Sequence, residues 1–150
     1  MDAGVITGEY CNSLDDKGRI SIPSRIRNEI AGNVLVVTRG IDKCLWVFPP
    51  EEWKKIAESL MASSSVFKSK TRLLQRRIIA PAAECEIDKA GRINIPPTLR
   101  DSAGLKKDVV ILGIERYIEI WDAEEYNGYL ATSENEFLEA AEELGEVLSQ

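Results

Sequence analysis

The sequence carries the same ten-residue pattern twice. Residues 14–23 read LDDKGRISIP and residues 87–96 read IDKAGRINIP, so the two copies lie 73 residues apart without a gap. Arg27 and Arg100 extend the match at the same separation. An internal repeat of this length indicates two copies of one folding unit. A chain of 150 residues can bury about 70% of its surface, enough for one compact body or two half-domains that share a core.

Each copy opens with a predicted hairpin. In the first copy its strands are residues 9–14 and 19–22, joined by a turn that Asp15 begins. Gly18, and Gly91 in the second copy, supply the positive φ that such a turn requires. Polar and apolar residues alternate along the second strand, so its two isoleucines share one face while its arginine and serine share the other.

The remaining elements follow in the same order in both copies. Residues 24–30 predict a short helix, residues 34–38 and 44–48 a second pair of strands, and Pro50 the start of a longer helix. The predicted fold class is therefore α/β (α+β), with two tandem β-α-β-β-α units. We assign residues 5–62 to the first repeat, 63–80 to a linking helix, 81–130 to the second repeat and 131–150 to an acidic C-terminal helix.

Acidic residues are concentrated at the carboxyl end. The chain carries 25 Asp and Glu against 19 Lys and Arg, a net charge of −6. Residues 1–100 hold 16 basic and 12 acidic side chains, whereas residues 101–150 hold 3 and 13. This asymmetry is typical either of a basic working surface beside an acidic tail or of a solvated acidic helix.

Several functional classes are disfavoured by the residue types. The chain has no histidine, and its three cysteines, Cys11, Cys44 and Cys85, are widely spaced rather than arranged as C-x-x-C. We therefore expect no metal site, no cofactor, no disulfide framework and no enzymatic activity. The sequence has no apolar run of the roughly 18 to 20 residues that span a bilayer, and no secretory signal. It predicts a cytoplasmic protein without a membrane partner.

Basic side chains surround the predicted hairpin in both copies. Arginine can form paired hydrogen bonds with phosphate or with the O6 and N7 edge of guanine, and a two-stranded ribbon fits a major groove. Double-stranded DNA is therefore the favoured partner. A structural role stays open, because each aspartate can accept N–H bonds within its turn and pair with the following arginine. The candidate DNA-binding residues are Asp15, Lys17, Arg19, Arg25 and Arg27 in the first copy and Asp88, Lys89, Arg92 and Arg100 in the second, with Gly18 and Gly91 as turn-forming residues.

Further motifs accompany the repeat. They are Gly8-Glu9-Tyr10, Leu14-Asp15-x-Lys17-Gly18-Arg19, Asp88-x-x-Gly91-Arg92 followed by Ile95-Pro96, and Glu119-Ile120-Trp121. Over about residues 5–126 the chain resembles the MraZ family, which belongs to the AbrB-like swapped-hairpin group of bacterial DNA-binding proteins. The resemblance implies that the two units interlock as one pseudo-twofold β-barrel, of the double-psi or swapped-hairpin type, with flanking helices.

The resemblance also implies a function. It suggests a transcriptional regulator, usually a repressor, that binds promoter repeats upstream of the bacterial division and cell-wall gene cluster. Such a protein would work in the nucleoid and assemble into a homo-oligomeric ring. Carried over by position, the paired Asp and Arg of each turn are the motif residues, while Lys17, Arg27 and Arg100 would contact the DNA backbone.

The two copies are not identical in their basic residues. The second copy has Ala90 where the first has Lys17, and Thr98 where the first has Arg25. Lys89 compensates only in part for these differences. We therefore expect the first turn to bind DNA more strongly than the second.

The sequence leaves two alternative functions, an antitoxin and an enzyme. An antitoxin of the same superfamily would grip a toxin through its C-terminal segment, and the acidic helix at residues 134–146 keeps this alternative open, although such antitoxins usually have a single copy. An enzyme could use Asp15, Asp16 and Asp88 as acid/base groups or magnesium ligands, but the chain lacks histidine and a phosphate-binding glycine loop. The C-terminal helix itself either packs on its own domain or contacts another subunit.

Overall fold

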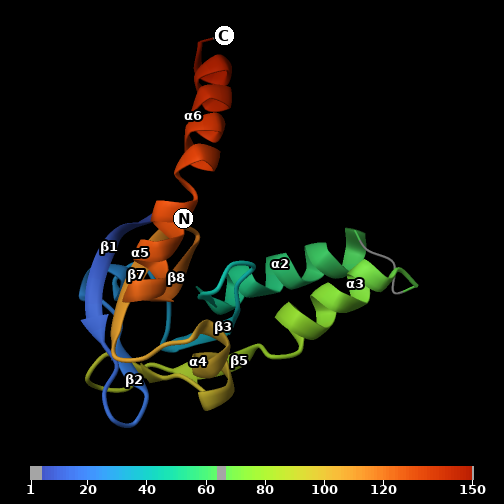
Figure 1. Ribbon diagram of the computed structural model, residues 1–150. Coiled ribbons are helices and arrows are strands. Elements are labelled where there is room, and N and C mark those ends of the chain that lie inside the picture. Colours follow the sequence, from blue (N-terminus) through green and yellow to red (C-terminus); the bar gives the residue numbers. More distant parts are fainter. Residues whose placement is uncertain (1–4, 64–66, 150) are drawn as a thin grey trace.

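The structure is a computed structural model that describes residues 5–63 and 67–149. Its strands form two antiparallel sheets (Figure 1). The smaller sheet pairs β2 (Arg19–Ser21) with β6 (Arg92–Asn94). The larger sheet has six strands, in the order β1 (Ile6–Ser13), β7 (Asp108–Glu115), β8 (Tyr117–Asp122), β4 (Leu45–Phe48), β3 (Val34–Arg39) and β5 (Ala83–Glu86).

The strand order is symmetric under exchange of the two sequence copies. It reads the same in reverse when β1 is exchanged with β5, β7 with β3, and β8 with β4. β4 and β8 meet at the centre of the larger sheet, where Val47 lies opposite Ile118. In the smaller sheet Ile20 lies opposite Ile93. A pseudo-twofold axis therefore relates the copies, and the predicted fold class is confirmed.

The pairing predicted for the hairpin at the start of each copy is wrong. β1 pairs along its whole length with β7, from Ile6 opposite Glu115 to Ser13 opposite Asp108. β2 pairs with β6, and β5 pairs with β3. Alternating side chains determine which face a strand buries, but they do not determine which strand lies beside it. The first strand of each copy is thus paired with a strand of the other copy.

One hydrophobic core lies between the two sheets. Ile20 and Ile93, from β2 and β6, are fully buried and pack with residues of the larger sheet that include Val37, Leu45 and Ile111. Burying a side chain of this size stabilises the fold by about 1.5–3 kcal/mol relative to leaving it exposed. The two-stranded sheet therefore closes the larger sheet into a barrel and is held there by apolar packing.

Two helices at equivalent positions of the copies contact equivalent strands of the barrel. Helix α2 (Pro50–Ser63) contacts β3 and β4, and helix α5 (Ala123–Thr132) contacts β7 and β8. The ring centroids of Phe48 and Trp53 lie 5.5 Å apart, and those of Trp121 and Tyr126 lie 5.3 Å apart. The same aromatic contact therefore fastens a helix to the barrel in each copy.

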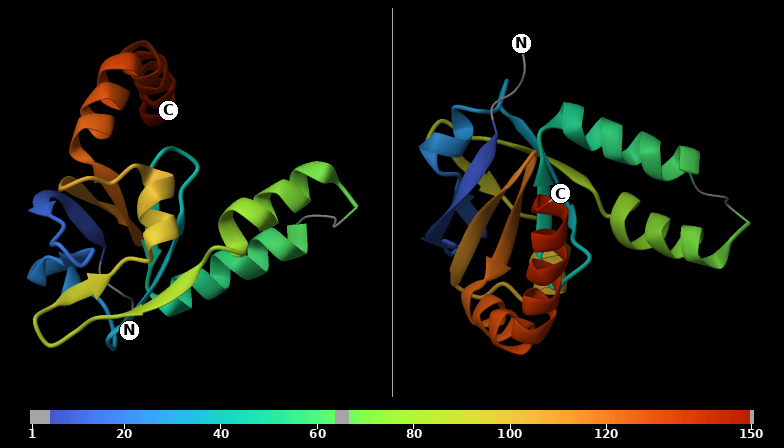
Figure 2. Two further views of the ribbon diagram at one scale, coloured as in Figure 1. Left: turned by 60° about the horizontal axis from the view of Figure 1, so that its bottom comes forward. Right: turned by 90° about the horizontal axis from the view of Figure 1, so that it is seen from above.

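Two parts of the chain project from the barrel (Figure 2). Helix α3 (Ser69–Leu74) continues as a π-helical turn, η1 (Gln75–Ile79), and runs beside α2. Helix α6 (Glu134–Leu148) stands away from the barrel, and none of its residues is buried. Residues 64–66, at the start of the predicted linking helix, and residue 150, at the end of the acidic helix, lie outside the described residues.

Candidate nucleic-acid interface

The turn between β1 and β2 is built around the carboxylate of Asp15. Its Oδ1 accepts hydrogen bonds from the backbone N–H groups of Lys17 and Arg19, both at 2.9 Å. Its Oδ2 accepts a hydrogen bond from Nε of Arg19 at 2.6 Å. The N–H of Gly18 donates to the carbonyl of Asp15 at 3.0 Å, and Gly18 has a φ of +79°. One carboxylate therefore fixes both the turn and the guanidinium that follows it.

Asp88 builds the same turn before β6. Its Oδ1 accepts from the backbone N–H groups of Ala90 and Arg92 at 2.9 Å, and its Oδ2 accepts from Nε of Arg92 at 3.2 Å. The ion pair is longer than in the first copy, and the side chain of Asp88 is 39% exposed against 33% for Asp15. The two turns therefore differ in the Asp–Arg side-chain contact, whereas their backbone hydrogen bonds have nearly equal lengths.

Hydrogen bonds to the charged carboxylates hold the pKa of both aspartates below its ordinary value. The largest cause is the backbone N–H of Arg19 for Asp15, and that of Arg92 for Asp88. Desolvation acts in the opposite direction and is outweighed. Both carboxylates are therefore ionised at neutral pH. The structural Asp–Arg pairing left open by the sequence is present in both turns.

Arg19 and Arg92 lie close together on the outer face of β2 and β6, and we call them the arginine pair. Arg19 is opposite Asn94 and Arg92 is opposite Ser21, which makes the two arginines diagonal neighbours. Diagonal neighbours in a regular ladder are about 7–8 Å apart. Nη1 of Arg92 also comes within 3.8 Å of Oδ2 of Asp15, so the first turn contacts both arginines. The fold joins two motifs 73 residues apart in the sequence into one surface.

Arg27, on helix α1 (Ser24–Arg27), and Arg100, on helix α4 (Pro97–Ala103), support the turns of the opposite copy. Nε of each donates to a backbone carbonyl of its own copy, at 2.9 Å for Arg27 and 3.0 Å for Arg100. A Cβ atom on Gly91 would lie 2.7 Å from Cζ of Arg27, and one on Gly18 would lie 2.5 Å from Cζ of Arg100. Glycine at each turn therefore leaves room for the guanidinium that crosses it from the other copy.

The sequence did not predict these contacts between each turn glycine and the other copy. The carbonyl of Gly18 accepts the N–H of Ile95 at 3.1 Å, and the carbonyl of Gly91 accepts the N–H of Ile22 at 2.9 Å. A signal was present, because a glycine and an arginine recur together at the same separation. The signal does not reveal that each glycine contacts the arginine of the other copy.

The other predicted site residues are exposed. Lys17 and Lys89 lie at the tips of the two turns, and Arg25 lies on α1. Ala90 and Thr98, which replace Lys17 and Arg25 in the second copy, are also exposed. The structure thus brings the arginine pair and both lysines to the same two-stranded sheet. Contact of any of these residues with DNA stays a prediction.

Other kinds of site have little support in the part of the chain that the structure describes. Within residues 5–63 and 67–149, no three histidine, cysteine, aspartate or glutamate side chains form a group that could hold a metal ion. Cys44 and Cys85 are buried, and burial raises the pKa of both thiols, so they stay protonated. No described helix is both long and apolar enough to span a membrane.

Comparison with known proteins identifies the family. The family model described as "MraZ protein, putative antitoxin-like" matches residues 5–77 and again residues 78–147. The chain belongs to the MraZ family. Among its relatives, the "Transcriptional regulator MraZ" of Treponema denticola is 51% identical over 142 residues, which make up 95% of this chain and 99% of the relative.

Other MraZ relatives are similar over nearly their whole length. The proteins named "Transcriptional regulator MraZ" in Treponema pallidum and Natranaerobius thermophilus are 44% and 42% identical to this chain. These matches cover 96% and 91% of this chain and 97% and 94% of the relatives. The predicted MraZ membership is confirmed. Transcriptional regulation, which these names state, is not an enzyme class.

Proposed function

We propose that this protein is a transcriptional repressor that binds double-stranded DNA in a sequence-specific manner. The observation that carries the proposal is the arginine pair. Two guanidinium groups, one from each copy, lie on a single outer face, and an aspartate fixes each of them before any DNA arrives. Orienting a flexible side chain in advance reduces the entropy lost on binding.

The basic residues divide into two roles. Asp15 and Asp88 accept hydrogen bonds from the Nε atoms of the arginine pair, so the Nη groups form none of the hydrogen bonds that fix the turns. Nη1 of Arg92 is only within ion-pair distance of Asp15, at 3.8 Å. The Nη groups fit a bidentate contact with O6 and N7 of guanine. Contacts with DNA phosphates suit the exposed side chains of Lys17, Lys89 and Arg25. They also suit the Nη groups of Arg27 and Arg100. The two aspartates position the arginines by accepting hydrogen bonds from their Nε atoms.

We further propose that the targets are promoter repeats upstream of the bacterial division and cell-wall gene cluster. The support is the family membership together with the name that the relatives carry, "Transcriptional regulator MraZ". Such a regulator works in the cytoplasm, associated with the nucleoid.

Assembly into a ring is supported by helix α6. This helix has six glutamates and no basic residue, and it exposes large apolar side chains, with Phe137 59% and Leu144 55% exposed. Residues 68–76, which include α3 and the start of η1, carry four basic residues and no acidic one. An isolated helix of 15 residues is marginal in water, so α6 needs a partner.

We therefore assign α6 of one subunit to the surface formed by α3 and the start of η1 in the next. The contact joins two different surfaces, and head-to-tail contacts of this kind close into rings when the rotation permits. A ring that meets several DNA repeats gains avidity, so each arginine pair needs only a modest affinity. Docking on a neighbour would also neutralise the acidic helix, which would otherwise repel DNA.

The experiment that tests the proposed function is DNA binding by arginine variants. Arg19→Ala and Arg92→Ala are each expected to weaken binding to the promoter DNA of the chain's own gene by about 1–3 kcal/mol, whereas Lys17→Ala mainly reduces the salt dependence. Fluorescence anisotropy over a range of salt concentrations measures both effects. A footprint of the wild-type protein upstream of its gene locates the site.

Arg116→Ala provides the matched control. Arg116 is an exposed arginine at the turn between β7 and β8. Its neighbour Glu115 lies opposite Ile6, at the end of β1 that is farthest from Asp15. Its loss removes the same charge far from the arginine pair. If the Arg19 and Arg92 double variant, still folded and assembled, bound the promoter as tightly as Arg116→Ala, the proposed role of the arginine pair would be wrong.

A second candidate function is an antitoxin, favoured by the words "putative antitoxin-like" in the family description and by the free acidic helix α6. In this case α6 would bind a toxin rather than a neighbouring subunit. Affinity purification of the full chain from its native cytosol distinguishes the two. Recovery of a small toxin in a fixed stoichiometry, lost on deletion of α6, would support the antitoxin.

A further inference from the structure

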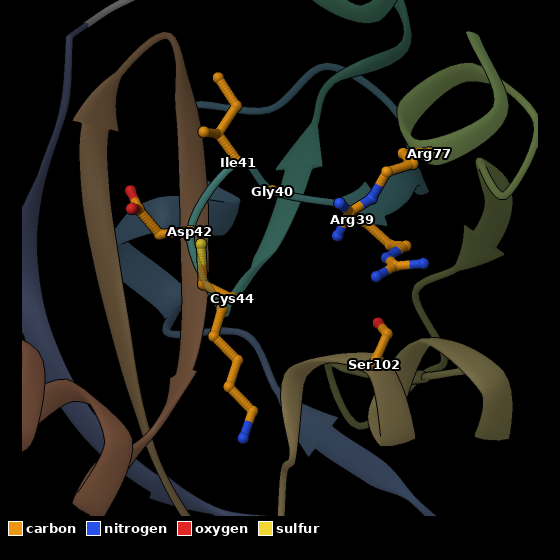
Figure 3. A pocket seen from close by; sticks show the side chains of 8 residues that line it. Arg39, Gly40, Ile41, Asp42, Cys44, Arg77 and Ser102 are labelled. Carbon is orange, nitrogen blue, oxygen red and sulfur yellow. The ribbon is translucent and has the colours of Figure 1, made fainter. Parts of the chain in front are cut away.

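A small pocket lies at the turn between β3 and β4 (Figure 3). Its volume is about 220 Å³. The lining comes from three parts of the fold that are distant in sequence. These are Arg39 with the turn at residues 40–44, Arg77 on η1, and Ser102 on α4.

Two arginines dominate the charge of this pocket. Figure 3 shows the guanidinium groups of Arg39 and Arg77 reaching into the same space, with the hydroxyl of Ser102 facing them. The ion pairs of the described residues do not include either arginine. Two neighbouring guanidinium groups without a carboxylate repel each other, and an anion between them would remove that repulsion.

The other charged residues of the lining point elsewhere. Figure 3 shows the carboxylate of Asp42 pointing away from the two guanidinium groups. Nζ of Lys43 is paired with Oε1 of Glu125 at 3.0 Å. The space between Arg39, Arg77 and Ser102 therefore keeps its positive charge.

The second copy shows that the fold does not require this charge. The position equivalent to Arg39 is Leu112, and the position equivalent to Ser102 is Glu29. A groove does lie beside the turn between β7 and β8, but Glu29, Glu51 and Glu115 are among the residues that line it. The same backbone thus carries a basic pocket in one copy and an acidic groove in the other.

We propose that the pocket of Arg39, Arg77 and Ser102 binds a small anion that carries a phosphate group. Guanidinium groups form paired, charge-assisted hydrogen bonds with phosphate oxygens. The hydroxyl of Ser102 donates to the carbonyl of Leu99 at 2.8 Å, and rotation of its proton lets it donate to a phosphate oxygen instead.

The size and position of the pocket set limits on the ligand. A volume of about 220 Å³ lies below the roughly 300–1,000 Å³ of sites for drug-sized ligands, so the pocket fits inorganic phosphate or a compact phosphorylated metabolite rather than a nucleotide. A DNA backbone phosphate has the same chemistry. It is disfavoured because the pocket lies at the turn between β3 and β4, away from the arginine pair on β2 and β6.

The test is isothermal titration of the full-length protein with inorganic phosphate. Saturable binding of one phosphate per chain is expected. Arg39→Gln and Arg77→Gln should each weaken it about tenfold or more, since each removes a hydrogen bond to a charged group. Arg116→Gln removes one positive charge at the equivalent turn of the second copy and should leave the affinity unchanged. Thermal unfolding without phosphate verifies that the exposed Arg77 variant is folded.

Three outcomes would overturn the proposal. The first is the absence of saturable phosphate binding to the wild-type protein, and the second is equal weakening by Arg116→Gln, which would indicate general charge attraction. The third concerns the affinity of the protein for promoter DNA. Arg39→Gln and Arg77→Gln should change this affinity by no more than about twofold. A tenfold loss of DNA affinity with a reduced salt dependence would assign the pocket to the DNA backbone.

Discussion

At the scale of single residues, Gly18 meets two separate requirements. Its φ of +79° is strained for a residue with a Cβ atom, and Arg100 of the other copy lies directly over it. Gly32 has a similar φ of +84°, but no atom lies within 4 Å of the place where its Cβ would be. Comparing Gly18 with Gly32 therefore separates the effect of backbone strain on stability from the effect of the contact with Arg100.

Gly18→Ala is expected to destabilise the protein more than Gly32→Ala. Both substitutions introduce strain of about 1–2 kcal/mol, because an L-residue is disfavoured at this φ. Gly18→Ala also displaces the guanidinium of Arg100 and weakens its hold on the first turn. Chemical denaturation of the two variants measures the difference in the free energy of unfolding.

An Arg100→Ala background provides the control for this prediction. Without the guanidinium, Gly18→Ala should cost about as much as Gly32→Ala. The coupling between Gly18 and Arg100 is expected to be about 0.5–3 kcal/mol, the range for residues in contact. Additive effects of the two substitutions would contradict the contact between the copies.

The aspartate turns predict a loss of stability in acid. Hydrogen bonds hold the pKa of Asp15 and Asp88 below the ordinary value of about 3.9, so in that range the unfolded chain binds more protons than the folded protein. The stability that these bonds contribute is complete above the ordinary pKa and is lost as the pH falls through the lowered pKa of the folded state. The Tm of the wild-type protein should therefore fall more steeply in this acid range than that of the Asp15→Asn and Asp88→Asn double variant. Parallel profiles of Tm against pH would contradict the assigned hydrogen bonds.

The turns were the part of the site that the sequence could predict. An aspartate, a glycine and an arginine at fixed spacing determine a local structure, and the structure has it in both copies. The roles of Arg27 and Arg100 could not be predicted in the same way. A basic residue near a basic turn indicates nucleic acid, and only the folded chain places each guanidinium over a glycine of the other copy.

At the scale of elements, α5 and α6 differ in how they are supported. Helix α5 packs on β7 and β8, and the carboxylate of Asp122 accepts the N–H of Glu125 at 3.3 Å at its start. Helix α6 has no buried residue, although its apolar side chains lie along one side as in a helix that packs against a partner. The sequence predicted this helix and its apolar face, but periodicity alone cannot identify the surface that covers the face.

Removal of residues 134–150 is expected to change assembly without unfolding the barrel. The reason is that α6 contributes no buried residue to the core, whereas the proposed contact with α3 and η1 of a neighbour depends on it. Light scattering coupled to gel filtration should show a smaller assembly, and the Tm measured by circular dichroism should change little.

Point variants test the same contact within an intact helix. Phe137→Ala together with Leu144→Ala removes two exposed apolar side chains and should reduce the assembly as the deletion does. Glu139→Ala, on another side of α6, serves as the matched control. An unchanged assembly in the Phe137 and Leu144 double variant would assign the ring contact to another surface.

At the scale of the whole molecule, neither copy has a complete sheet of its own. Among the described residues, four of the six strand pairings join different copies: β1 with β7, β2 with β6, β3 with β5, and β4 with β8. The repeat predicted two equivalent units, and the pseudo-twofold axis confirms their equivalence. The exchange of strands could not be read from the repeat, because a unit that pairs with itself and a unit that pairs with its copy have the same pattern of buried residues.

The interlocked sheets predict that neither half of the chain folds alone as a monomer. A fragment of residues 1–80 lacks the partners of β1 and β2, and it leaves Ile20 without Ile93 across the smaller sheet. A fragment of residues 81–150 lacks the equivalent partners. Each fragment alone should be unfolded or self-associated, since unpaired strand edges and exposed apolar faces favour association. Mixed at equal concentrations, the two should form a one-to-one complex whose circular dichroism matches that of the intact chain. A cooperative thermal transition of monomeric fragment 1–80 would contradict the exchange, because the first copy would then have a complete core of its own.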